Sequence, residues 1–477
     1  MDWLNATDYD FAREVLQRGV AALYVIGFAS AIAQFPALLG EHGLLPAPAY
    51  LSRIRGRRIP TIFHWRYSDR LLIAVCVFGI VVSLALVLGL PQAAGPWLPF
   101  LAFGLIWLGY LSIVNIGQTF YGFGWESLLL EAGFLMAFLG SHQAAPPILI
   151  IFLARWLAFR LEFGAGMIKI RGDRSWRDLT ALYYHHETQP MPNPVSRTAH
   201  RLPKPLHRVE VLGNHFTQLV VPFFLFAPQP LASAAAGIII VTQLWLVISG
   251  NFAWLNVLTI ILAFSAVSDP VAGVLLPWLV PGEVDTIMPG YFVALVLGGT
   301  LLMLVLSYWP ARNLVSRHQL MNASFNSFHL VNAYGAFGTV TQQRYEVIVE
   351  GTRSESPDAT DWQEYEFKGK PGDLHRMPRQ FAPYHLRLDW LMWFLALGGR
   401  TDRWFIVFLQ RLLEADRRTL RLLRLDPFRG ERPRWVRARL FLYRFSDRAE
   451  KREQGVWWVR HELTTLIPPI GLPDQAD

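Results

Sequence analysis

The sequence predicts an integral membrane protein, in which a multi-pass α-helical bundle is followed by a smaller, β-rich α+β soluble domain. Two observations carry this prediction. The chain of 477 residues is 53% hydrophobic and only 17% charged, against about 25% charged residues in soluble proteins. The charges are also unevenly spread, because 34 of them fall in residues 1–310 and 46 in residues 311–477. We therefore assign residues 1–310 to the membrane and residues 311–477 to a water-soluble domain.

The composition also excludes several classes of protein. So few charges exclude a soluble enzyme and a disordered chain. The single cysteine, Cys76, excludes an intrachain disulfide and a Cys-rich metal site. Of the net charge of +8, six units belong to residues 311–477. We interpret that region as a folded domain and expect no nucleic-acid partner.

The apolar segments suggest eight or nine spans. A spanning helix needs about 20 mostly apolar residues, because each adds about 1.5 Å across a hydrocarbon core about 30 Å thick. Residues 128–140 and 212–227 are the least clear of the candidates. The candidate segments are residues 20–39, 71–90, 98–117, 128–140, 148–163, 212–227, 231–249, 252–268 and 291–309.

Two loops are strongly basic. Residues 41–70 carry six Arg against two acidic residues, and the polar loop 164–211 carries eight basic residues against four acidic ones. Basic loops stay preferentially on the cytoplasmic side of a membrane. This rule predicts that both loops are cytoplasmic and, with nine spans, that the C-terminal domain is cytoplasmic too.

The C-terminal domain has the patterns of strands and helices. Residues 343–352 alternate between apolar and polar side chains, as in a half-buried strand. Further strands are expected near residues 362–368, 435–445 and 456–460. Residues 388–397 and 403–425 are expected to form helices, and the second is amphipathic. Its basic face suits either anionic lipid or solvent.

Charged and polar side chains at membrane depth are informative, because a lone charge there costs at least about 2.5–3.5 kcal/mol. Glu131 is expected to pair with Arg155 on the next helix. Such groups form either buried pairs that fix the bundle or a polar cavity for a substrate or lipid headgroup. The cluster assigned to these roles is Arg155, Arg160, Glu162, Arg171, Asp173, Trp176, Asn214 and His215.

Lys169 lies between Ile168 and Ile170, directly after an apolar helix. Desolvation disfavours an ammonium, so a lysine held there can become a general base or a nucleophile. The alternative is a snorkelling lysine that anchors the helix end.

His185 and His186 are adjacent, and adjacent helical residues point about 100° apart, which is poor spacing for a metal. We therefore expect no metal site. The sequence also lacks the GxSxG, GxxxxGK[ST], HExxH and CxxC motifs, and we expect no cofactor.

Several long runs resemble the lipase maturation factor family. They include GAGMIKIRGDRSWRDLTALYYHHETQPMPNP from residue 164, NAYGAFGTVTQQRYEVIVEGT from residue 332, and residues 250–269 and 362–400. The resemblance implies a multi-pass protein of the endoplasmic reticulum membrane that assists folding and assembly of secreted lipases. It also implies a lipase-binding C-terminal domain on the lumenal side, opposite to the side that the loop charges predict.

A shorter stretch, GMIKI, is similar to the region around the reactive lysine of vitamin K-dependent gamma-carboxylase. Carried over to this chain, that similarity points to Lys169 alone. The 39 Arg against 5 Lys are typical of a GC-rich, bacterial genome, in which case the cell membrane would replace the endoplasmic reticulum.

Two functions are therefore predicted. The first is a non-enzymatic membrane chaperone, with the lipid bilayer and a secreted, lipase-like client as partners. The second is an integral-membrane enzyme on a lipid- or quinone-like substrate, using Lys169 with His185, His186 or Glu131. The aromatic residues expected to bind a client are Trp362, Tyr365, Phe367, Trp390 and Trp393.

Overall fold

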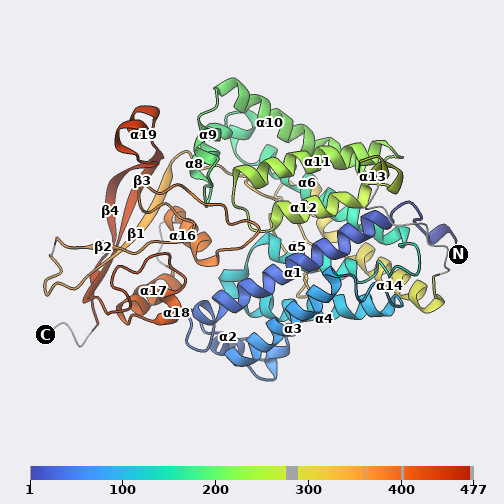
Figure 1. Cartoon of the computed structure of the whole chain (residues 1–477), viewed down its shortest axis with the longest axis horizontal. Helices are drawn as coiled ribbons and strands as arrows, with labels where there is room; N and C mark the ends of the chain where they lie inside the picture. The colour runs from blue at the N-terminus through green and yellow to red at the C-terminus, as the bar shows by residue number, and fades with distance from the viewer. Residues whose placement is uncertain (1, 276–287, 359, 399–401, 473–477) are drawn as a thin grey trace.

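The computed structural model describes residues 2–275, 288–358, 360–398 and 402–472. A helical bundle runs along the long axis of the molecule, and a region containing a sheet covers one end of it (Figure 1). The predicted order, a helical membrane part followed by a sheet-containing region, is confirmed.

Six helical segments among the described residues are long and apolar enough to cross a membrane. Their outward faces are apolar, since Val81, Val241 and Leu301 are 60–69% exposed, as lipid-facing side chains of an integral membrane protein are. The six segments are α1 (Asp10–Leu38), α3 (Asp69–Val87), α4 (Trp97–Ile116), α10 with its following turn (Lys204–Phe226, of which α10 is Lys204–Leu219), α11 (Leu231–Ser249), and α14 (Gly290–Leu306) with α15 (Tyr308–Val315).

Three further predicted spans fall short of these criteria. The helices α5 (Gly124–Met136) and α12 (Leu255–Ala263) are too short, and α6 (Ile148–Arg171) is long but carries several charges. All three lie within the bundle, where α6 packs against α5, α10, α12 and α14. Apart from the exposed Arg171 at the end of α6, their charged side chains therefore face protein and not lipid.

The polar loop folds into short helices before α10. They are α7 (Arg174–Arg177), α8 (Leu182–Thr188) and α9 (Ser196–His200). Asp173 caps α7, because its side chain accepts the Ser175 N–H at 2.9 Å. These helices pack against α6, α10 and the first strand of the sheet.

The sheet is antiparallel, with the order β2-β1-β3-β4. Its strands are β1 (Arg344–Thr352), β2 (Gln363–Glu364), β3 (Trp435–Phe445) and β4 (Trp458–Ile470). The strand β1 is buried in the middle on both faces, so the prediction of a half-buried strand was wrong, because Glu346 and Glu350 are buried in ion pairs. The strand β4 forms a long and largely exposed edge. The short helix α19 (Arg448–Gln454) joins β3 to β4 and begins with a capping box of Asp447 and Glu450.

The helices of this region are α16 (Arg387–Gly398), α17 (Arg403–Leu413) and α18 (Arg417–Leu420). The prediction of one helix over residues 403–425 was wrong. Ala415 has a φ of 51°, which ends the helix. Asp416 then caps α18 by accepting the Thr419 N–H at 2.8 Å.

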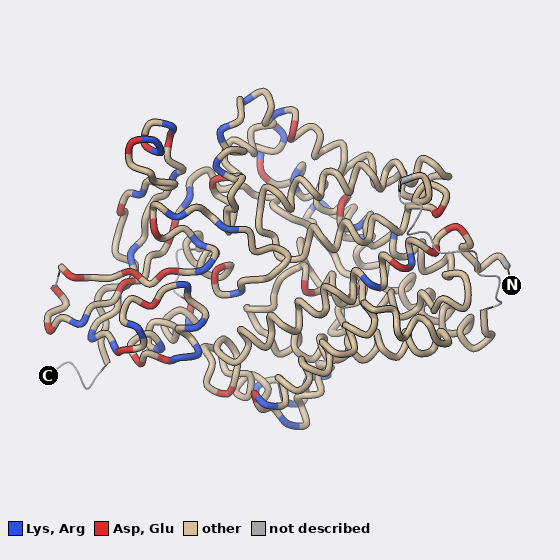
Figure 2. The backbone as a smooth tube through the Cα atoms, viewed as in Figure 1, with Lys and Arg blue, Asp and Glu red and all other residues tan. Residues whose placement is uncertain are grey.

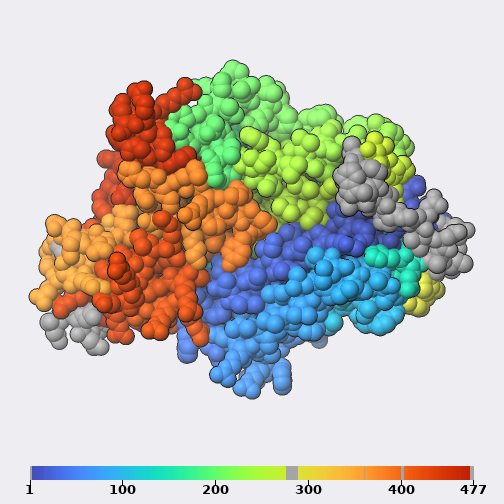
Figure 3. All heavy atoms as spheres, viewed as in Figure 1, coloured from blue at the N-terminus to red at the C-terminus, as the bar shows by residue number. Residues whose placement is uncertain are grey.

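Both basic loops contact the C-terminal region. In the loop 41–70, which contains α2 (Ala47–Arg53), Asp69 forms an ion pair with Arg418 (2.6 Å). In the polar loop, the Gln189 carbonyl O accepts from Arg344 of β1 (2.5 Å). Charged residues gather at this end of the molecule and are sparse along the helices (Figure 2). The space-filling view shows the C-terminal residues packed directly on α1 and on the polar loop (Figure 3). At the opposite end, α13 (Asp269–Leu275) packs against the start of α1.

Candidate functional site

Two neighbouring cavities lie where the bundle meets the polar loop and the C-terminal region. One has a volume of about 290 Å³ and the other about 480 Å³. They share wall residues, which are Leu161, His185, Leu255, Ala336 and Phe337. We call the smaller one the polar cavity and the larger one the aromatic cavity.

Lys169 lies in the polar cavity and does not extend to the bundle surface, because it is only 5% exposed. Its Nζ donates to Asn214 Oδ1 and to Gln218 Oε1, both at 2.9 Å and both on α10. The same Nζ lies 4.6 Å from the centre of the Trp176 ring, a cation–π contact. Two amides and an indole therefore hold the ammonium inside protein.

Glu162 is seven residues before Lys169, on the same face of α6 and about two turns away, and it also lines the polar cavity. Its Oε1 accepts from Gln243 Nε2 at 2.5 Å, and its Oε2 has no hydrogen-bond partner among the described residues. Leucines such as Leu161 and Leu246 complete the wall. This mixture of polar and apolar surface suits an amphiphilic ligand.

His185 separates the two cavities, with its ring 5.0 Å from that of Phe337. Burial, and to a smaller extent the Lys169 charge, lowers the pKa of His185 to about 4. The imidazole is thus neutral at pH 7, so that one of its ring nitrogens can donate a hydrogen bond and the other can accept one. Its neighbour His186 points elsewhere, toward His207 and Glu210.

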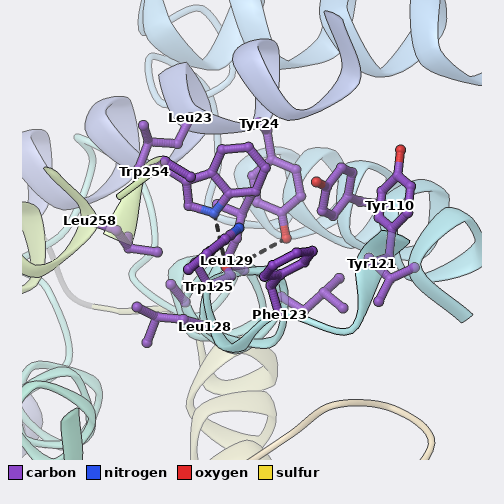
Figure 4. Packing of buried hydrophobic residues seen from close by; sticks show 14 of the residues in the cluster. Leu23, Tyr24, Tyr110, Tyr121, Phe123, Trp125, Leu128, Leu129, Trp254 and Leu258 are labelled. Carbon is purple, nitrogen blue, oxygen red and sulfur yellow. Dashed lines mark hydrogen bonds between the residues drawn. The ribbon is translucent and has the colours of Figure 1, made fainter. Parts of the chain in front are cut away.

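The aromatic cavity lies between α5 and α16. Trp125 stacks on Phe123 (4.7 Å between ring centres) and contacts Trp390 at the same distance. Figure 4 shows Phe123 and Trp125 beside Trp254, whose indole donates to the Trp125 carbonyl O (2.9 Å). On the α16 side the cavity is lined by Trp390, Trp393 and Phe394. Such a wall binds apolar side chains.

A buried charge network lies behind the aromatic cavity. Arg387 of α16 donates to Glu126 Oε1 (2.7 Å), and Tyr110 donates to Glu126 Oε2 (2.5 Å). The Arg387 guanidinium also lies 3.9 Å from the centre of the Tyr121 ring. His385 Nδ1 is 3.2 Å from the same carboxylate. This network fastens the C-terminal region to α4 and α5.

The predicted partner of Glu131 was wrong. Glu131 pairs with Arg160 and accepts hydrogen bonds from Tyr334 (2.7 Å) and Asn332 N (3.0 Å).

Arg155 instead donates to the Ser265 and Leu225 carbonyl oxygens. Arg155 and Arg160 are five residues apart, so they point about 140° from each other around α6. Glu131 therefore belongs to a structural pair and does not line the polar cavity.

The other residues of the predicted polar cluster support the polar cavity from outside. Arg171 donates to the Leu314 carbonyl O (2.8 Å), and Asp173 Oδ2 accepts the Val340 N–H (3.0 Å). His215 Nε2 is 3.0 Å from the Trp176 carbonyl O. The first two contacts tie the end of α6 and the start of α7 to residues 314–340, and the third ties α10 to α7.

The aromatic residues predicted to bind a client fall into two groups. Tyr365 and Phe367 are buried in the core of the C-terminal region. Trp362 is half-buried, with the Arg437 guanidinium 4.1 Å from its ring centre. Trp390 and Trp393 line the aromatic cavity, and Trp393 donates to the Thr188 carbonyl O at 3.0 Å.

Sequence reasoning missed Phe123, Trp125, Glu126, Gln243 and Arg387. Glu126 lies in the apolar run FGWESLLLEAGF (residues 123–134) and could have been identified as a buried charge in the same way as Glu131, which is in the same run. Its partner Arg387, however, is 261 residues away along the chain, and no local pattern connects the two.

Comparison with known proteins gives consistent matches over nearly the whole chain. Residues 11–274 match the family model "Lipase maturation factor transmembrane domain", and residues 330–468 match "Lipase maturation factor C-terminal domain". The chain is 39% identical to lipase maturation factor 1 of Bos taurus, over 99% of this chain and 91% of that protein. The human protein of that name is 37% identical, over 99% of this chain and 90% of its own length.

A more distant relative is lipase maturation factor 2 of Gallus gallus. It is 28% identical over 97% of this chain and 82% of its own length. No solved structure matches the chain.

Proposed function

Because the chain belongs to the lipase maturation factor family, we propose that it is a membrane-embedded maturation factor that assists the folding or assembly of secreted lipases. The observation that carries this proposal is the similarity to lipase maturation factor 1, which extends through both the helical and the C-terminal regions. The bilayer and the lipase client are then the partners of this protein.

The aromatic cavity is the proposed contact with the client. It combines stacked aromatic rings with an opening at Phe394, which is 48% exposed. Folding intermediates expose apolar side chains, which a wall of Trp and Phe can cover without fixed polar partners. The exposed edge of β4 supplies a second contact, because a free edge can pair with an extended client segment.

Secretion of active lipase from cells that lack their own maturation factor tests this contact. We expect Phe394→Ser to lower the yield of active lipase several-fold while leaving the amount of membrane protein unchanged. Phe328→Ser is the matched control, because Phe328 is also 48% exposed but lies away from the cavity. Equal yields from both variants would exclude the aromatic cavity as the client contact.

The polar cavity supports a second candidate function, an enzyme acting on a lipid- or quinone-like substrate. The supporting observation is that one cavity is lined by buried Lys169, by His185 and by Glu162, whose Oε2 has no hydrogen-bond partner in the described part of the chain. Glu131 and His186 do not belong to this group.

Lys169→Met separates the two functions. A chaperone that binds through the aromatic cavity should retain client binding and lipase yield in this variant, whereas an enzyme should lose its activity. Lys169→Arg serves as the control that keeps the charge and the amide contacts. Full lipase yield from Lys169→Met would reject the enzymatic function in this pathway.

We also propose nine membrane crossings and a location in the endoplasmic reticulum membrane. Six crossings are the apolar segments, and α5, α6 and α12 make the others inside the bundle. Two sets of hydrogen bonds join the connecting segments at either end of the bundle, and they support a path in which successive connections alternate between the two ends. One set joins Ala6 to Pro146, Asp10 to Asp269 and His142 to Gln92, and the other joins Gln118 to Leu45 and Arg171 to Leu314.

A further inference from the structure

Three side chains that can bind a metal ion lie close together between α8 and α10. His186 comes from α8, and His207 and Glu210 come from α10. One ligand atom of each lies within 4.8 Å of a ligand atom of the other two. His186 Nε2 is 3.9 Å from Glu210 Oε1.

The spacing on α10 produces half of this arrangement. His207 and Glu210 are three residues apart, so they lie on one face of the helix. The helix α8 packs against that face and brings in His186. The ring centres of His186 and His207 are 5.9 Å apart.

The ring nitrogens that face the cluster are free of other partners. His186 is 2% exposed, yet neither of its ring nitrogens has a hydrogen-bond partner among the described residues. His207 Nε2 lies 3.3 Å from the His200 carbonyl O, and its Nδ1 has no partner there. His207 has the form of a histidine ligand to a metal, with one nitrogen oriented by a carbonyl and the other left for the ion.

The carboxylate of the cluster is also oriented. Glu210 Oε1 accepts the Trp245 indole N–H at 2.6 Å, which fixes the carboxylate between α10 and α11. Glu210 lines the polar cavity as well. If an ion were bound beside Glu210, a coordination position not filled by protein would therefore face the polar cavity.

We propose that His186, His207 and Glu210 bind a divalent transition-metal ion of the zinc class. Two imidazoles and one carboxylate, with a fourth position for water, are a common ligand set for Zn²⁺. Metal–ligand distances of about 2.0–2.2 Å require the ligand atoms to approach to about 3.5 Å, which small side-chain rotations achieve. The ion joins the polar loop to α10, and the site is independent of client binding.

The experiment uses the full chain in detergent, purified through a tag without histidine and freed of metal by a chelator. Co²⁺ is the probe, because its visible absorption reports coordination by nitrogen and oxygen ligands. We expect one equivalent to bind, Zn²⁺ to displace it, and the melting temperature to rise with either ion. Absence of one-to-one Co²⁺ binding would overturn the proposal.

Variants locate the bound ion. His186→Ala, His207→Ala and Glu210→Gln should each weaken Co²⁺ binding at least about tenfold. Loss of a residue that only supports a ligand already weakens metal binding by about this factor, so loss of a ligand should have at least the same effect. Glu210→Gln retains an oxygen for the Trp245 N–H, so its metal-free melting temperature should stay near that of the wild type. His461→Ala on the exposed edge of β4 is the control and should bind as the wild type does. Unchanged affinity in all three cluster variants would place the ion elsewhere and reject the site.

Discussion

At the residue scale, the fold depends on buried charges that are paired by distant parts of the chain. Glu126 with Arg387, and Glu131 with Arg160, are fully buried pairs. Removing one member of such a pair costs about 3–5 kcal/mol, because the other charge is left uncompensated. In the C-terminal region, Lys370 and Arg344 share Glu346 in the same way.

Asp389 of α16 provides a prediction about pH. Burial raises the pKa of Asp389 to about 6, although the Gly369 N–H donates to its Oδ1 at 2.6 Å. The unfolded chain ionises this carboxyl near pH 3.8, so the folded state holds the extra proton between pH 4 and 6. Its contribution to stability therefore falls as pH rises through this window, by roughly 3 kcal/mol in total.

The variant Asp389→Asn keeps an acceptor for the Gly369 N–H but does not ionise. We expect the difference in melting temperature between this variant and the wild type to increase in favour of the variant from pH 4 to pH 6, and to stay constant above pH 6. Asp358→Asn, at an exposed carboxyl, is the control. A difference between Asp389→Asn and wild type that does not change with pH would contradict the prediction.

At the element scale, α6 organises the bundle because it can approach its neighbours closely. A Cβ on Gly164 would lie 2.5 Å from the Tyr334 carbonyl O, and one on Gly166 would lie 2.7 Å from Leu219 Cδ2. The run GAG thus permits contact with residues 332–338 and with α10. That contact brings Lys169 within reach of Asn214 and Gln218.

Gly164→Ala tests this close packing. The added methyl group must displace backbone, so we expect a loss of about 1–3 kcal/mol in stability and a lower melting temperature in detergent. Gly237→Ala in α11 is the matched control, because nothing lies within 4 Å of its new Cβ. That control should be neutral, or gain up to about 1 kcal/mol from helix propensity. A neutral Gly164→Ala variant would refute the packing argument.

At the scale of the whole molecule, both basic loops and the C-terminal region lie at one end of the bundle. The loop charges favour the cytoplasmic side for all three. A secreted client folds on the other side of the membrane, so we propose that this end is exoplasmic. Both basic loops, residues 41–70 and 164–211, would then be exceptions to the charge rule.

Reporters test the orientation and the number of crossings together. A reporter fused after Asp477 and one inserted at Gly56 in the basic loop 41–70 should both be exoplasmic, and one before Met1 should be cytoplasmic. If the reporters at Gly56 and after Asp477 were on opposite sides of the membrane, the contact between this loop and the C-terminal region would be contradicted. Cytoplasmic signals from both would reverse the proposed orientation and exclude direct contact with a lumenal client.

The sequence by itself determined the membrane class and the family, and the boundary near residue 310 stays a prediction. Apolar runs of sufficient length and the strand-forming composition of residues 343–352 are local properties, which neighbouring residues express without reference to the rest of the chain. The length and charge of α5 and α6 were also visible, but whether they contact lipid or protein was not.

The tertiary structure decided the partners of the charged and polar residues. Glu131 meets Arg160 and not Arg155 because of the rotation of α6. His186 gains His207 and Glu210 from a second helix, although the adjacent histidines alone argued against a metal. Lys169 is buried by α10 and Trp176. These outcomes depend on contacts between segments far apart along the chain, and periodicity within one segment carries no information about them.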